Sequence, residues 1–269
     1  MYLEFFGLKE PPFNITPDPR FLFFSERHRE AFDHLIYGIL QRKGFIQLTG
    51  EVGSGKTTLC RAVLSDLPQN VRTALILNPA LSENQLLRAI LNDFGVPVKG
   101  KDRLAYIEQL NEFLLKQLEE GYNVTLIIDE AQDLSPGVME QIRLLNNLET
   151  DQHKLLQIVL VGQPELEAKL ATKELRQLRQ RIIVKAHLRA LTREETGQYI
   201  GHRLHVAGAD GSVSFNAAAI KSVHRRSKGM PRVINTIADH AMMAAYVVRS
   251  RVVGPREVKR CLEHLESTL

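Results

Sequence analysis

Nine consecutive residues have the types and spacing of a loop that binds polyphosphate. They lie between an apolar run at 45–49 and a helical pattern at 59–64, the context that such a loop requires, and are Gly50, Glu51, Val52, Gly53, Ser54, Gly55, Lys56, Thr57 and Thr58. The glycines allow successive backbone N–H groups to point at a phosphate, and a helix beginning near Lys56 adds the positive end of its dipole. We expect Lys56 to reach the β- and γ-phosphates and the hydroxyl of Thr57 to ligate Mg²⁺.

An acidic pair, Asp129 and Glu130, ends the apolar run at 123–128. Ligands of open α/β sheets lie at the carboxyl ends of parallel strands, so these acids belong at a ligand site. Asp129 suits the acid that acts on Mg²⁺ together with Thr57, and Glu130 suits the group that orients and polarises an attacking water. The extra strand between the loop and the acids separates this pattern from kinases and small GTPases.

Gln163 ends another apolar run, at 155–162. Its amide would hydrogen-bond either the γ-phosphate or the attacking water. The alternative is that Gln163 only caps the turn before Pro164, and the sequence leaves both interpretations open.

The segment at 169–189 is the most basic part of the chain. Three interpretations stay open: a solvated surface, an arginine finger that reaches the nucleotide of a neighbouring subunit, or a surface for nucleic acid or acidic lipid. A further cation, Arg232, lies in the first turn of a helix that begins at Pro231, where a nearby anion would offset its unfavourable position. Arg232 is therefore a candidate phosphate sensor.

Apolar runs at 45–49, 73–77, 123–128 and 155–162 alternate with helical patterns, which predicts an α/β domain with buried parallel strands. From Leu191 the alternation stops and four helical patterns follow. We therefore predict a nucleotide-binding domain at 1–190 and a small all-α lid domain at 191–269. An arm at 5–24, rich in phenylalanine and proline, either packs on the first domain or contacts the nucleotide directly, or does both.

The bulk composition fits a chain with a sizeable core, since 44% of its 269 residues are hydrophobic. Its two cysteines, Cys60 and Cys261, have no metal-like spacing, and a reducing compartment is the simpler expectation. The pattern contains neither a secretory signal nor a run long enough to span a bilayer. We expect a cytoplasmic protein with no metal other than Mg²⁺.

Together, the loop, the inserted strand, the acidic pair, Gln163, the arginine cluster and the lid with Arg232 resemble an AAA+ ATPase. Further blocks are similar, over essentially the whole chain, to the general secretion pathway protein A (ExeA-type) family, which is related to the MSHA pilus-biogenesis ATPases. These blocks are Met1-Tyr2, Phe6-Gly7-Leu8, Pro12-Phe13, Thr16-Pro17-Asp18-Pro19, Phe21-Leu22, residues 48–53 and 129–132, Gly162-Gln163-Pro164-Glu165-Leu166 and Gln180-Arg181-Ile182.

The resemblance implies a P-loop AAA+ core with sheet order 5-1-4-3-2, and ATP as the ligand. By that resemblance Lys56 and Thr57 bind phosphate and Mg²⁺, and Asp129 and Glu130 are the Walker B acids. Gln163 is the first sensor and Arg232 the second. The finger is Arg181 in preference to Arg179, acting between subunits of a homo-oligomer.

The same resemblance implies that ATP hydrolysis drives assembly of the type II secretion pore or of a pilus system. A membrane-anchored partner of the general secretion pathway protein B type is then expected, at the inner face of the bacterial inner membrane. The chain is either the cytoplasmic part of a longer protein or a short relative. The alternative is a nucleotide-switched DNA-binding AAA+ regulator of the transposition type, in which the segment at 169–189 and Lys221, Arg225, Arg226 and Lys228 contact phosphates.

Overall fold

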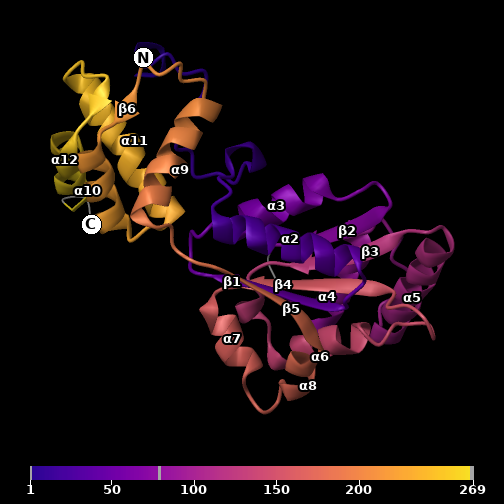
Figure 1. Ribbon diagram of the computed structural model, residues 1–269. Helices are drawn as coiled ribbons and strands as arrows, with labels where there is room; N and C mark the ends of the chain where they lie inside the picture. Colours follow the sequence, from indigo (N-terminus) through magenta and orange to yellow (C-terminus); the bar gives the residue numbers. More distant parts are fainter. Residues whose placement is uncertain (1, 78–79, 267–269) are drawn as a thin grey trace. The chain divides into compact units, whose positions relative to one another are not determined.

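A computed structural model describes residues 2–77 and 80–266, with side chains described as far as Cys261. The chain forms two compact units, shown in Figure 1. The sheet unit consists of Arg29–Glu51 and Cys60–Leu188. The helical unit consists of Met1–His28, Val52–Leu59 and Arg189–Leu269.

Five parallel strands form the sheet in the order β2-β3-β4-β1-β5, which confirms the predicted order. Their bounds are β1 Phe45–Gly50, β2 Val71–Ile76, β3 Asn123–Ile128, β4 Leu156–Gly162 and β5 Ile182–Leu188. In register, Thr49 of β1 lies opposite Gly162 of β4, and Leu160 of β4 lies opposite Ile128 of β3. The carboxyl ends of β1, β3 and β4 therefore meet at one edge of the sheet.

Helices cover both faces of the sheet (Figure 1). One face carries α4 Glu83–Asp93, α5 Arg103–Glu119, α6 Pro136–Leu145, α7 Pro164–Leu170 and α8 Arg176–Arg181, all of which contribute to one apolar core. The opposite face carries α2 Glu26–Leu40 and α3 Lys56–Asp66. Because both faces are covered, every residue of β1, β3 and β4 is buried.

The start of α4 shows how local sequence sets these elements. Ser82 accepts a hydrogen bond from the N–H of Gln85, and the side chain of Gln85 accepts one from the N–H of Ser82. Leu86, Leu87, Ile90 and Leu91, which recur at helical spacing, are fully buried. In α5, however, Leu104 is exposed, since it lies in the first turn of the helix.

One strand differs from expectation. The run at 73–77 was predicted to be a buried strand, but β2 lies at the edge of the sheet and pairs with β3 alone. Only Ala74 and Ile76 of β2 are buried. A short apolar run does not distinguish a central strand from an edge strand, because that difference depends on which strands arrive beside it.

The helical unit contains the four helices expected after Leu191, namely α9 Arg193–Val206, α10 Ala217–Ser227, α11 Pro231–Val247 and α12 Pro255–Glu266. Thr192 forms a capping box with Glu195, and Asn216 caps α10. The unit also contains the helix α1 Tyr2–Phe5 and the 3₁₀ helix η1 Pro19–Phe21. Two short parallel strands, β6 Ser214–Phe215 and β7 Val252–Val253, were not predicted from the sequence. Among the described residues, none of the helices is both long and apolar enough to cross a membrane.

The N-terminal arm packs within the helical unit, whereas we assigned it to the nucleotide-binding domain from sequence. Phe6, Phe13 and Phe21 are buried there, in a core that includes Tyr199 and Leu204 of α9. The expectation that these rings are buried is confirmed. A direct contact of the arm with nucleotide stays a prediction.

Candidate functional site

The phosphate loop belongs to the helical unit, apart from Gly50 and Glu51. Gly53 and Gly55 have φ values of 76° and 101°, in the left-handed region that glycine adopts without strain. Glycine at position 53 also meets a spatial requirement, because an added Cβ would lie 2.5 Å from the Cβ of Arg232. Helix α3 begins at Lys56, whose side chain is buried, as is that of Ser54.

Arg232 lies against this loop through its backbone. Its N–H donates to the carbonyl oxygen of Gly53 over 3.2 Å, while its side chain is exposed. Pro231 supplies the first residue of α11, so Arg232 lies in the first turn, as predicted. Its role as a nucleotide sensor stays a prediction.

The sequence did not single out His28, which also contacts the loop. Its Nε2 donates to the carbonyl oxygen of Ser54 over 3.1 Å, which leaves Nδ1 to accept from the hydroxyl of Ser25 at 2.7 Å. The ring is buried, and this burial lowers the pKa of His28 below its usual range. The contact joins residues 26 positions apart, so no local pattern indicates it.

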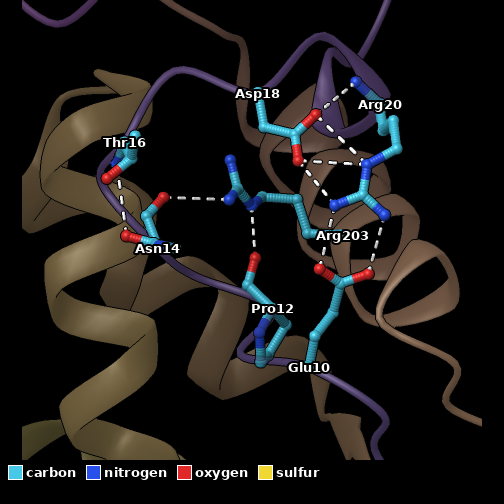
Figure 2. A network of polar contacts seen from close by, with 7 residues as sticks. All are labelled: Glu10, Pro12, Asn14, Thr16, Asp18, Arg20 and Arg203. Carbon is cyan, nitrogen blue, oxygen red and sulfur yellow. Dashed lines mark hydrogen bonds and ion pairs between the residues drawn. The ribbon is translucent and has the colours of Figure 1, made fainter.

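Arg203 of α9 anchors the arm that leads to His28. Figure 2 shows its guanidinium directed at the arm, where Nε donates to the carbonyl oxygen of Pro12 at 2.5 Å and Nη2 to that of Asn14 at 3.0 Å. Its Nη1 donates to the hydroxyl of Tyr199 at 3.1 Å, and its Cζ lies 4.8 Å from the ring centre of Phe21. Only 7% of the residue is exposed, so it holds the arm from inside the unit.

These contacts form a continuous chain of interactions that begins at Gly53 and ends at the next loop residue, Ser54. The hydroxyl of Tyr199 donates to Oδ1 of Asn235 at 2.7 Å, and Asn235 lies on α11, one turn after Arg232. From Gly53, contacts therefore run through α11 and α9 to Arg203 and the arm. The arm then returns to Ser54 through His28, so lid helices and arm support the loop together.

The sheet unit holds the predicted acids at the end of β3. Asp129 is buried, and its Oδ1 accepts the N–H of Glu130 at 2.9 Å. Glu130 adopts a left-handed conformation, φ 50° and ψ 39°, which is uncommon for a residue with a side chain. Its Oε2 accepts hydrogen bonds from the side-chain amides of Gln132 at 2.8 Å and Gln163 at 3.3 Å. The carboxylate of Glu130 is thus held by two donors in a strained backbone position.

Gln132 is a second residue whose importance the sequence reasoning missed, although it belongs to the quoted block at 129–132. Its Oε1 accepts the N–H of Gln163 at 3.1 Å, and an added Cβ on Gly162 would lie 2.8 Å from that oxygen. Gln132 therefore ties the end of β3 to the end of β4. Gln163 makes no side-chain capping hydrogen bond, so the structure brings its amide to Glu130 instead.

The basic segment is not a uniform solvated surface. Lys169 donates to the carbonyl oxygens of Gln132, at 2.7 Å, and Leu134, and so fixes the turn after Glu130. Arg181 donates to Oδ1 of Asn147 at 2.5 Å and weakly to the carbonyl of Arg143 at 3.4 Å. Arg179 is exposed. Arg181 therefore forms hydrogen bonds within its own chain, and its role as an arginine finger for a neighbouring subunit stays a prediction.

The residues of the loop fit a triphosphate. The hydroxyl of Ser54 is buried and has no hydrogen-bond partner among the described residues, an unusual state that an incoming acceptor or donor would relieve. The glycine conformations and the buried Lys56 agree with this fit. Mg²⁺ prefers hard oxygen ligands, such as the hydroxyl of Thr57 and the carboxylate of Asp129, and the role of these two residues in holding it stays a prediction.

Comparison with known proteins agrees with these features. A family model described as an AAA domain matches residues 39–170. General secretion pathway protein A from Aeromonas hydrophila is 48% identical over 247 residues, which are 91% of this chain and 45% of that protein. The chain belongs to the AAA+ family. The predicted resemblance to general secretion pathway protein A is confirmed, for a chain that spans less than half of that relative's length.

More distant AAA+ relatives share the fold. The Holliday junction branch migration complex subunit RuvB from Limosilactobacillus reuteri is 22% identical over 90% of this chain and 62% of its own length. Among solved structures, the ORC2 protein of Aeropyrum pernix has a TM-score of 0.70 at 16% identity, covering 95% of this chain and 71% of that one. The RuvB motor of Thermotoga maritima has a TM-score of 0.60 at 20% identity, covering 90% and 70%.

Proposed function

We propose that this AAA+ chain binds ATP with Mg²⁺ and hydrolyses it. The observation that carries the proposal is the carboxylate of Glu130, held by the amides of Gln132 and Gln163 at the sheet edge where β1 leads into the phosphate loop. A carboxylate held in this way suits a group that orients a water and accepts its proton. Lys56 and Thr57, with the N–H groups of the loop, would bind the phosphates. Asp129 would help to hold Mg²⁺, and the bound ion would act as a Lewis acid on the phosphate oxygens.

Steady-state ATP hydrolysis by the Glu130→Gln variant tests this role. Because the amide cannot accept a proton, turnover should fall by about 10² to 10⁴-fold, while the affinity for a fluorescent ATP analogue stays near the wild-type value. Glu165→Gln is the matched control, since Glu165 is an exposed acid two residues after Gln163. Turnover that survives in Glu130→Gln would remove Glu130 from the reaction and overturn the proposal.

We further propose that subunits associate and that Arg181 stabilises the transition state on a neighbour's nucleotide. In the single chain Arg181 donates to Asn147, so this role requires the guanidinium to leave that partner. Specific activity should then rise with protein concentration. Mixing Arg181→Ala with Glu130→Gln should restore part of the activity, because each variant supplies the group that the other lacks. The same mixture made with Arg179→Ala tests the neighbouring cation, and restoration with that variant alone would reassign the finger.

For the biological role we propose that hydrolysis drives assembly of a type II secretion pore or a pilus system. The identity with general secretion pathway protein A supports this, and a membrane-anchored partner of the general secretion pathway protein B type at the inner face of the inner membrane follows from it. Substituting this chain for the matching part of the Aeromonas protein should preserve secretion, and the Glu130→Gln form should abolish it. Hydrolysis that stays flat with concentration until duplex DNA is added would favour the transposition-type regulator instead.

A further inference from the structure

The turn that joins α11 to β7 exposes an unusual set of apolar side chains. Val247 is 70% exposed, and Val248 and Val252 are about half exposed, at 48% and 49%. Met243, one helical turn before Val247, is 49% exposed as well. Tight turns are normally built from glycine, asparagine, aspartate and serine. Exposed aliphatic residues at both ends of one short turn form an apolar patch, which marks a surface that contacts something other than water.

Two arginines stand between these valines. The guanidinium of Arg249 lies 5.0 Å from the ring centre of Tyr246 and 5.6 Å from that of Phe5, and the guanidinium of Arg251 lies 5.6 Å from the same Phe5 ring. The rings of Phe5 and Tyr246 pack edge to face, 5.5 Å apart. Aromatic residues of α1 and α11 therefore hold both cations beside the exposed valines.

The two cations are available for an anionic partner. Among the residues that the structure describes, neither guanidinium forms an ion pair. The acid that Arg251 influences is the fully exposed Asp210, whose pKa is lowered first by hydrogen bonds from Ser212 and last by the charge of Arg251. Arg249 also has a φ of 55°, so an arginine occupies a position where glycine or asparagine would be relaxed.

Positive charge is concentrated around this turn. Residues 246–260 contain five basic residues and one acid, Glu257, which gives +4. That value equals the formal net charge of the whole chain. The segment at 169–189 carries an excess of positive charge as well, so the turn lies in one of two basic regions whose field attracts anions.

We propose that residues 247–252, the α11–β7 turn, bind an anionic phospholipid bilayer. The valines enter the boundary between headgroups and acyl chains, while Arg249 and Arg251 bind the phosphates. Nucleic acid would also attract the arginines, but its phosphate backbone offers no apolar medium for three exposed valines. The proposal goes beyond ATP hydrolysis and is independent of it.

Vesicle flotation of the full chain tests the proposal. The chain should float with phosphatidylcholine vesicles that contain about 30% phosphatidylglycerol, and not with phosphatidylcholine alone. Arg249→Gln with Arg251→Gln should weaken binding by about 25-fold, or about fivefold for each charge. Val247→Ser with Val248→Ser should also weaken it by at least about tenfold at unchanged charge. Lys221→Gln with Arg225→Gln removes two exposed cations of α10 and should change binding much less.

Site-specific fluorescence distinguishes insertion from adsorption. Val247→Cys carrying an environment-sensitive dye should shift to shorter wavelength on anionic vesicles, and Lys221→Cys should not. The native Cys60 and Cys261 are buried, and burial raises the pKa of the Cys261 thiol to about 11, so labelling is confined to the new thiol.

Two results would overturn the proposal. If Val247→Ser with Val248→Ser left vesicle binding unchanged, charge alone would hold the protein at the vesicle surface. Binding to duplex DNA that depends on Arg249 and Arg251, with no flotation on anionic vesicles, would identify a nucleic-acid surface. Circular dichroism of each variant shows whether its fold is retained, and the dye shift at Val247→Cys leaves both arginines in place.

Discussion

The arm should open far more readily when Arg203 loses its charge. Arg203→Met keeps an unbranched side chain in the buried position but removes the three donors seen in Figure 2 and at Tyr199. The carbonyl oxygens of Pro12 and Asn14 then lose their donor, at about 1 to 3 kcal/mol for each buried acceptor. Part of this loss is offset, because burying the guanidinium itself costs free energy in the wild type. The free energy that keeps the arm closed should fall by about 2 to 4 kcal/mol.

Native-state hydrogen exchange at Lys9 measures this change directly. The N–H of Lys9 donates to the carbonyl oxygen of Ala207 at 2.8 Å, a bond that breaks when the arm leaves α9. Since about 1.4 kcal/mol corresponds to a factor of ten, its exchange should accelerate by about 30- to 1,000-fold. Global unfolding by urea, followed by circular dichroism, separates local opening from loss of the whole fold.

Arg20→Met is the matched control. Arg20 binds Glu10 and Asp18 on the same arm, but 62% of its side chain is exposed, so water screens these ion pairs. Exchange at Lys9 should stay close to the wild-type rate. Equal acceleration in both variants would refute the argument that burial makes Arg203 the anchor. Since the arm returns to Ser54 through His28, the Arg203 variant should also bind an ATP analogue more weakly.

Three further substitutions test the site. Gln132→Ala should lower kcat by about 10- to 100-fold with little change in KM for ATP, because Glu130 loses its closer amide donor; an unchanged kcat would mean that Gln163 alone positions the acid. Gly53→Ala should lower the free energy of unfolding, measured by thermal denaturation, by about 1 to 3 kcal/mol more than Gly211→Ala does. Both glycines have a positive φ, but only at position 53 would the added Cβ lie within 4 Å of another side chain, that of Arg232. His28 has a folded-state pKa below the ordinary 6.5, so the unfolded chain binds its proton more tightly and stability decreases as pH falls through 6.5 toward the folded-state value. Between about pH 5 and about pH 7.5, the urea midpoint of the His28→Gln variant should change less with pH than that of the wild type. An equal pH dependence in the two proteins would contradict this assignment.

Local features of the sequence determined much of the architecture. The caps at Ser82, Thr192 and Asn216 and the helix starts at Pro231 and Pro255 depend on residues within four positions of each other, and the phosphate loop depends on nine consecutive residues. Their outcome could therefore be predicted from short windows of sequence. The sheet order followed from the resemblance to a known family, since no local pattern determines which strands are neighbours.

Tertiary structure alone decided which side chains support the site. Arg203 meets Pro12 across 191 positions, His28 meets Ser54 across 26, and Gln132 meets the N–H of Gln163 across 31. The exposed edge of β2 and the arm's packing in the helical unit have the same origin. Hydrogen bonding and burial depend on the groups that folding brings to a position, and for these residues those groups come from distant segments of the chain.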